Sequence, residues 1–184
     1  MTREEKELWL QRVIDEIKAH GGRVVEKKGW FWKALHYVVM VVTFGGNREF
    51  LTRYYTTLGG TIGYPKGWEK SSLESRIAVL EHELVHIKQC KKFGLGNVWL
   101  GLPLYTPLYL LFPLPVGLAY FRWRFEREAY AHGIRCRLKM EPELYDKLID
   151  HAVNELTSGA YGWTWPFQSS AYGYFYANVP RPSK

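Results

Sequence analysis

Cysteine is scarce in this sequence, with only Cys90 and Cys136 among 184 residues. The two do not form a CxxC pair, which excludes a zinc ribbon, and they are too few for a disulfide framework. We therefore expect a reducing compartment, the cytoplasm. The charged, amphipathic N-terminal stretch also lacks an apolar run of the kind that signal peptides contain.

The sequence also lacks internal repeats and any clear linker, so we expect a single domain over residues 1–184. A hydrophobic content of 47% with 16% aromatic residues excludes a disordered chain. The formal net charge of +7 is compatible with a nucleic acid, an anionic membrane or an acidic partner, and does not choose among them.

The order of predicted elements indicates an α+β fold. Thr2 and Glu5 form a capping box at the start of a first helix, which Gly21 and Gly22 end. The β-branched and aromatic run 34–44 predicts a buried strand, and a turn at 45–47 leads to a returning strand. That returning strand covers 49–58. We further expect a short edge strand over 59–65, helices over 70–92, 120–140 and 141–156, and an irregular aromatic tail over 157–184.

The predicted helix over 70–92 carries the stretch His82-Glu83-Leu84-Val85-His86. Residues four apart are neighbours on one helix face, so His82 and His86 can hold a single ion while Glu83 projects beside them. An apolar stripe runs along a different face of this helix. We therefore expect one face to pack in the core and the other to face a cleft; the stripe comprises Leu73, Ile77, Leu80, Leu84 and Ile87.

A catalytic zinc ion requires three protein ligands and one open position for water. The helix over 120–140 provides two candidates for the third ligand, Glu126 and Glu128. Glu126 shares a face with the small residues Ala129 and Gly133, which permit close approach to another helix. Glu128 points away, where an exposed ion pair with Arg124 would explain it. We therefore predict a Zn²⁺ site formed by His82, His86 and Glu126.

The HExxH motif followed by Glu-x-x-Ala in "RFEREAY" resembles the gluzincin metallopeptidases, and in particular the Ste24/HtpX-type and minigluzincin pattern. The resemblance covers roughly residues 50–135. It implies a zincin-like fold, in which "TIGYP" is the edge strand along the substrate cleft, and a zinc-dependent endopeptidase acting on a peptide or protein. Tyr130 departs from this pattern, because the family usually has there an Asp that orients a zinc-binding histidine.

The implied chemistry makes Glu83 the general base that takes a proton from a metal-activated water and returns it to the leaving amine. A further group should stabilise the oxyanion. The sequence offers five candidates, each of which packing or exposure at a helix surface also explains: His151, Tyr161, Tyr172, Tyr174 and Tyr176.

Residues 93–121 carry no charged side chain and contain four prolines. The stretch is long enough to cross a bilayer, but its prolines would break a spanning helix repeatedly. Basic residues at both ends favour a hairpin that returns to one side. Two interpretations stay open: a proline-kinked apolar loop that wraps the metal-binding helices, and shallow membrane insertion that would make the protein membrane-associated.

Two further functions stay open as alternatives to a peptidase. Basic residues crowd around the predicted metal helices, and with the abundant aromatic residues they could hold single-stranded nucleic acid. A non-catalytic, zinc-stabilised binding module is the other alternative. Cys90, four residues after His86, is a weaker candidate for a fourth ligand, since thiolate ligands usually occur in groups.

Overall fold

The computed structural model describes residues 1–42, 49–52, 54–111, 118–158 and 164–182 of the chain. It is rich in helix and holds one small sheet, in agreement with the predicted α+β class. The helices are α1 (Arg3–Ala19), α2 (Trp30–Val42), α3 (Leu73–Phe93), α4 (Val98–Leu111), α5 (Tyr120–Leu138), α6 (Tyr145–Thr157) and α7 (Gln168–Asn178), and short 3₁₀ turns cover Trp68–Lys70 and Pro142–Leu144.

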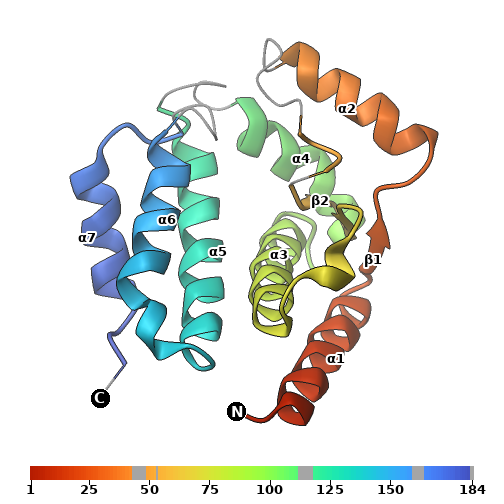
Figure 1. Ribbon diagram of the computed structural model, residues 1–184. Coiled ribbons are helices and arrows are strands. Elements are labelled where there is room, and N and C mark those ends of the chain that lie inside the picture. The colour runs from red at the N-terminus through yellow and green to blue at the C-terminus, as the bar shows by residue number, and fades with distance from the viewer. Residues whose placement is uncertain (43–48, 53, 112–117, 159–163, 183–184) are drawn as a thin grey trace.

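Helix α3 lies at the centre, between the sheet with α1 on one side and α5 on the other (Figure 1). Its predicted apolar stripe is confirmed, since Ile77, Leu80, Leu84 and Ile87 are buried. They share a core with residues of α1 and with Ile62 of the sheet. A second core joins α5, α6 and α7, which lie side by side.

The first helix begins and ends as its sequence predicts. The Thr2 side chain accepts a hydrogen bond from the Glu5 amide, and the Glu5 carboxylate accepts one from the Thr2 amide, which completes the capping box. Gly21 follows the helix with a positive φ of 78°. Helix α3 has Ser72 as its N-cap, with the hydroxyl accepting from the Ser75 amide.

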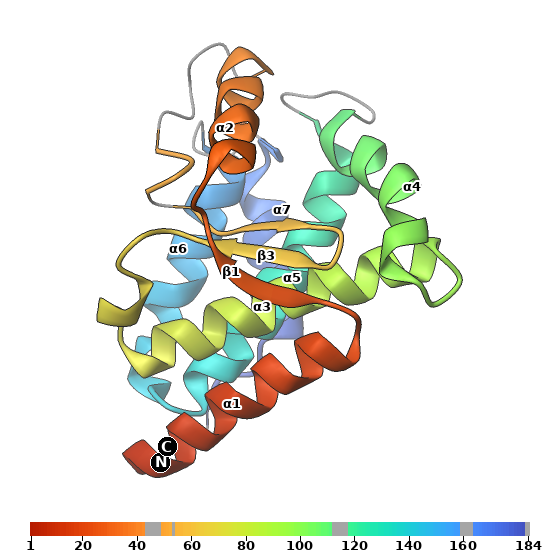
Figure 2. The ribbon, with the colours of Figure 1, turned by 90° about the vertical axis from the view of Figure 1, so that its right-hand side faces the viewer.

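The sheet has three strands in the order β1-β3-β2: β1 (Arg23–Glu26), β3 (Thr61–Tyr64) and β2 (Thr56–Leu58). It crosses over α3 (Figure 2). The prediction that residues 59–65 form an edge strand is wrong, because β1 pairs with β3 in parallel and β2 pairs with it on the other side. Gly63 is needed in this central strand for packing, since a Cβ there would lie 2.4 Å from the Trp32 ring. The edge strand beside α3 is β2.

The run 34–44 was expected to be a strand, but its described residues belong to helix α2. Short apolar runs do not distinguish a buried strand from a helix by periodicity, and β propensity yields to tertiary context. The returning strand over 49–58 shortens to β2, and the turn expected at 45–47 lies outside the described residues. Helix α2 leaves large apolar side chains exposed, among them Trp30, Tyr37 and Val41.

The proline-rich stretch and the tail are more helical than predicted. Residues 98–111 form α4, which contains Pro103 and Pro107 and packs on α3. The described residues 98–111 of the stretch therefore cover the predicted metal helices α3 and α5, as a helix in place of the expected loop. Pro113 and Pro115 lie outside the described residues. In the tail, α7 replaces the expected irregular chain, because Ala171 and Phe175, four residues apart, bury one face of it against α6.

Among the helices of the described ranges, none combines the length and the apolarity that crossing a membrane requires.

Candidate metal centre

The structure brings the side chains of His82, His86 and Glu126 together between α3 and α5. The two histidine Nε2 atoms lie 3.1 Å apart. Glu126 Oε2 is 3.3 Å from His82 Nε2, and Glu126 Oε1 is 3.5 Å from His86 Nε2. These ligand atoms form one group compatible with a metal ion. Sequence reasoning therefore predicted correctly that these three residues meet, although their role as ligands stays a prediction.

Close helix packing places Glu126 in this group. A Cβ on Gly133 would lie 3.1 Å from the Ala78 carbonyl oxygen and 3.4 Å from His82 Cβ, so α5 approaches α3 as closely as the small residues predicted. Ala129 is fully buried on the same face. The Glu128 side chain is instead exposed and accepts a hydrogen bond of 2.8 Å from Gln89 Nε2. Glu128 therefore contacts α3 through Gln89, a partner that the expected ion pair with Arg124 on its own helix does not include.

The spacing of these atoms fits a tetrahedral zinc ion. Zinc–nitrogen and zinc–oxygen bonds of about 2.0–2.2 Å place neighbouring tetrahedral ligands about 3.4 Å apart, and the group is spaced at 3.1 to 3.5 Å. Two facing imidazole nitrogens so close together require a proton or a cation between them. Glu126 Oε2 is buried, and among the described residues its polar neighbour is His82 Nε2 at 3.3 Å, an arrangement that suits a carboxylate oxygen able to serve a metal ion.

Electrostatics within the group favour a cation at this point. Burial is the largest single influence on His86 and lowers its pKa, but the charge and hydrogen bond of Glu126, the charge of Glu83 and the contact with Gln89 together outweigh burial and raise the pKa to about 9. Burial acts to raise the pKa of Glu126, yet the charge of His86 and the hydrogen bonds of both histidines hold it well below its ordinary value. The carboxylate thus stays ionised in the interior because positive charge faces it.

A ring of hydrogen bonds orients the candidate ligands. His86 Nδ1 lies 3.0 Å from Gln89 Oε1 and 3.1 Å from the Tyr105 hydroxyl. A proton on Nδ1 shared with Gln89 leaves the Nε2 lone pair directed at the site, as metal-binding histidines require. The Tyr109 hydroxyl donates to Glu126 Oε1. Helix α4 therefore supplies two tyrosines to the site.

Sequence reasoning missed Gln89, Tyr105 and Tyr109 as supporting residues. A signal was present, because Gln89 follows His86 by three positions and the two tyrosines are four apart in an otherwise apolar stretch, hence on one helix face. Tyr130, which replaces the family's usual Asp, packs its ring edge-on against the His82 ring at 4.8 Å between centroids. It orients His82 by a ring contact.

Glu83 lies at the cleft side of the site. Its Oε2 accepts a hydrogen bond of 2.6 Å from the Thr57 hydroxyl of the edge strand β2. Together with His82 it lines a cleft of about 390 Å³ between the segment just before β2, α3, α5 and α6. The predicted separation of α3 into a packing face and a cleft face is thereby confirmed.

Of the five oxyanion candidates, His151 lines this same cleft with His82 and Glu83. Tyr172 donates instead to Asp150, Tyr176 stacks on Tyr172, and Tyr174 packs against Trp123. Tyr161 lies outside the described residues. Tyr54 and Tyr55, which lie just before β2, also line the cleft. The sequence did not single them out and held no signal for them, because tyrosines in a predicted strand usually pack.

Cys90 is not part of the group. Its sulfur donates to the Val98 carbonyl oxygen, and the side chain is buried against the start of α4. This geometry argues against a fourth protein ligand from Cys90.

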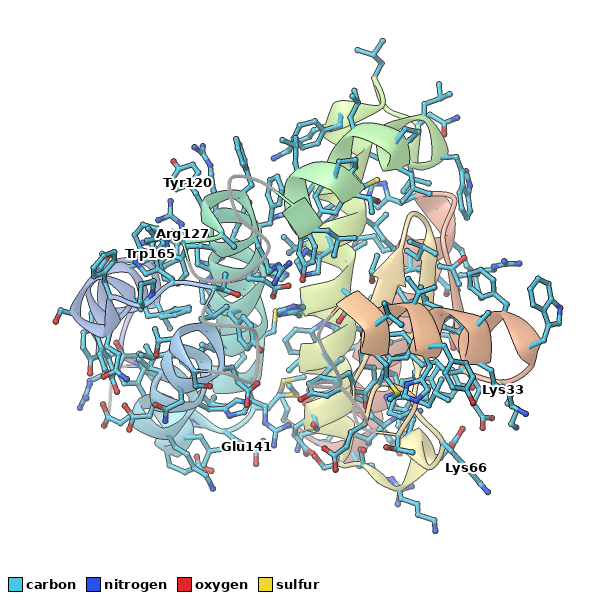
Figure 3. The ribbon with its side chains drawn as sticks, turned by 90° about the horizontal axis from the view of Figure 1, so that it is seen from above. Lys33, Lys66, Tyr120, Arg127, Glu141 and Trp165 are labelled. Carbon is cyan, nitrogen blue, oxygen red and sulfur yellow. The ribbon has the colours of Figure 1, made fainter. Side chains whose placement is uncertain are left out.

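Three of the basic residues around the metal helices take part in separate contacts. Lys88 pairs with Glu16 at 2.6 Å, Arg127 lies over the rings of Trp123 and Tyr174, and Arg135 donates to the Asn178 carbonyl. Figure 3 shows Arg127 beside Tyr120 and Trp165, far from Lys33 and Lys66 on the other side of the molecule. Binding of nucleic acid stays a prediction without a test.

Comparison with models of known protein families, with curated protein sequences and with solved structures found no match to this chain. The resemblance to gluzincins therefore continues to depend on the motif residues themselves.

Proposed function

We propose that this protein is a zinc-dependent peptidase of the gluzincin type, with a zincin-like arrangement of the edge strand β2 along the helix that carries HExxH. The observation that carries the proposal is the convergence of His82, His86 and Glu126 next to a cleft that Glu83 also lines. A bound zinc ion would supply a Lewis acid that polarises a carbonyl oxygen and lowers the pKa of a coordinated water toward 7.

The residues of the chain would divide the remaining work. His82, His86 and Glu126 would hold the ion. The hydrogen bond that Gln89 accepts from His86 and the one that Tyr109 donates to Glu126 would keep these two residues in place. Glu83 would accept a proton at its carboxylate and pass it to the leaving amine. The hydroxyl of Thr57 fixes the Glu83 carboxylate at one oxygen and leaves the other for this exchange.

The cleft supports a peptide as substrate. β2 pairs with β3 along one edge only in the described sheet, so its other edge is available to an extended peptide, which would add as a further strand. His151 lines the cleft and would be placed to donate to the oxyanion. Glu155 and Arg137, at the same cleft, would contact substrate side chains of opposite charge.

The decisive experiment compares Glu83→Gln with wild type on an unstructured protein such as casein. The amide keeps the size and the hydrogen bond of Glu83 but removes its basicity. Zinc content and thermal stability should stay near wild type, while peptide hydrolysis should fall about a hundredfold or more. Hydrolysis that continues at the wild-type rate in Glu83→Gln would refute the assigned mechanism.

The non-catalytic alternative makes a different prediction for metal removal. A zinc-stabilised binding module should lose its fold on chelation, as small structural zinc domains do. The peptidase should lose activity on chelation and keep most of its circular dichroism signal, because α3 already packs in an extensive apolar core.

We also propose peripheral membrane contact through α4. This is supported by exposed large apolar side chains on and just before that helix, Leu95, Trp99, Leu100 and Leu104. Sedimentation with anionic lipid vesicles tests it: wild type should co-sediment, and the double variant Trp99→Ser/Leu100→Ser should stay in the supernatant. Equal sedimentation of both proteins would exclude α4 as the contact.

A further inference from the structure

A second group of metal-ligating side chains lies between the same two helices. Glu81 of α3, His132 of α5 and Cys136 of α5 bring a carboxylate oxygen, an imidazole nitrogen and a sulfur within 4.8 Å of one another. His132 Nε2 is 2.8 Å from Glu81 Oε2 and 3.7 Å from Cys136 Sγ. None of the three belongs to the first group, since Glu81 leaves α3 on a different side from His82.

The two groups are built reciprocally. In the first, α3 supplies two ligands four residues apart and α5 supplies one carboxylate. In the second, α5 supplies two ligands four residues apart, His132 and Cys136, and α3 supplies one carboxylate, Glu81. The distance between α3 and α5 thus lets two residues four apart on either helix meet a carboxylate of the other helix.

The geometry points to a second metal site, formed by Glu81, His132 and Cys136 and selective for zinc or a similar thiolate-binding divalent cation. A tetrahedral zinc ion separates a sulfur and a nitrogen ligand by about 3.6 Å and a nitrogen and an oxygen ligand by about 3.4 Å. The sulfur is thus already in place, and the carboxylate would move outward by about 0.6 Å. A mixed sulfur, nitrogen and oxygen donor set disfavours magnesium and calcium, which take oxygen ligands.

A simple ion pair between Glu81 and His132 explains less of the arrangement. Such a pair does not require a thiol to approach the same ring nitrogen, yet Cys136 Sγ does so from a buried position. The other Glu81 oxygen accepts a hydrogen bond of 2.8 Å from Trp9 Nε1 of α1, which orients the carboxylate in the way that carboxylate ligands are usually oriented.

A Cys–His–Glu catalytic arrangement is also disfavoured. In a nucleophile–base–carboxylate triad, the nucleophile and the carboxylate contact opposite nitrogens of the histidine ring. Here both contact Nε2. Burial also raises the pKa of the Cys136 thiol to about 12, which leaves no thiolate to act as a nucleophile without a metal.

The role of this site would be structural. A metal ion there would join α3 to α5, and the hydrogen bond from Trp9 to Glu81 would link both to α1. Glu81 precedes His82 on α3, and His132 precedes Gly133, where the two helices approach closely. The His132 side chain is 34% exposed, so an ion can enter from solvent and a water can complete the coordination. The metal would thereby stiffen the helix pair that positions the first site.

Titration of the full-length, metal-free protein with Co²⁺ tests this site without any substrate. Cobalt bound by a thiolate gives an intense near-ultraviolet charge-transfer band, and the first group contains no thiolate. Wild type should bind two equivalents and show the band. His82→Ala should bind one equivalent and keep the band, whereas Cys136→Ser should bind one equivalent and lose it.

A second variant guards against misfolding. His132→Gln should lose the band and one equivalent while its circular dichroism spectrum in the absence of metal matches wild type. Cys90→Ser is the matched control and should keep both. Saturation of wild type at one equivalent without a thiolate band would overturn the second site, as would a band that survives in Cys136→Ser. Failure of the peptidase assay would leave these readings unchanged, so the two proposals fail separately.

Discussion

Helix α3 presents two faces that differ in kind. Toward α1 and the sheet it is apolar, with Leu84 and Ile87 buried and charged pairs such as Lys6 with Glu74 confined to the rim. Toward α5 it buries ionisable groups, and Glu126 opposite is 1% exposed. The first face gains free energy by removing carbon from water, whereas the second is stable only because each buried charge has a partner. Changes on the two faces should therefore separate stability from function.

The largest effect should come from the face toward α5. Glu126→Ala should abolish stoichiometric zinc binding, because it removes one of the three proposed ligands. Glu128→Ala, two residues away, should change zinc affinity by less than about tenfold, since Glu128 reaches the site only through Gln89. Zinc content after dialysis against a metal buffer measures both. The reverse ranking would place Glu128, and not Glu126, in the site.

The face toward α1 should respond to Leu84→Ala with lost stability. Leu84 is 1% exposed in the central core, and deletion of a buried leucine costs about 3 kcal/mol in the free energy of unfolding. Urea denaturation should record that loss, while the folded variant should keep its zinc. Loss of zinc at unchanged stability would show that the two faces are not independent.

A smaller effect should follow from the support of His86. Gln89→Leu removes the acceptor of the His86 Nδ1 proton and the donor to the Phe125 carbonyl oxygen. Zinc affinity should fall about tenfold, with the ligand set retained. Competition with a chromophoric chelator measures the affinity, and Gln89→Glu, which keeps an acceptor oxygen, should recover most of it. An unchanged affinity in Gln89→Leu would mean that Tyr105 alone suffices.

The smallest effect concerns the rim of the α1 face and depends on pH. The hydrogen bond from Lys6 lowers the pKa of Glu74 from 4.5 to about 2. Because the folded-state pKa lies below the unfolded one, the pair stabilises the protein above about pH 4.5, and the contribution is lost as the pH falls toward 2. Solvent screening limits it to about 1 kcal/mol.

Glu74→Gln should therefore lower the free energy of unfolding at pH 7 and converge with wild type near pH 2. Denaturation at several pH values provides the measurement, with Glu7→Gln as a control on the exposed side of α1, where the pair with Arg3 is open to solvent. A difference between Glu74→Gln and wild type that persists at pH 2 would show that the pair is not its cause.

The sequence by itself determined the elements whose signals are local. The capping box at Thr2, the division of α3 into two faces and the position of Glu126, rather than Glu128, beside the histidines all depend on helix periodicity and on the size of neighbouring side chains, which act within one or two turns. These features could be predicted because no distant partner changes them.

Only the tertiary structure decided the features whose partners are distant in sequence. The run 34–44 has the composition of a strand, but β1 and β2 take both sides of β3, and the described residues of the run belong to α2. In the same way, Tyr109 reaches Glu126 and Thr57 reaches Glu83 through packing that no local pattern records. The free energy of such contacts depends on which elements meet, and local propensity is too small to fix that outcome.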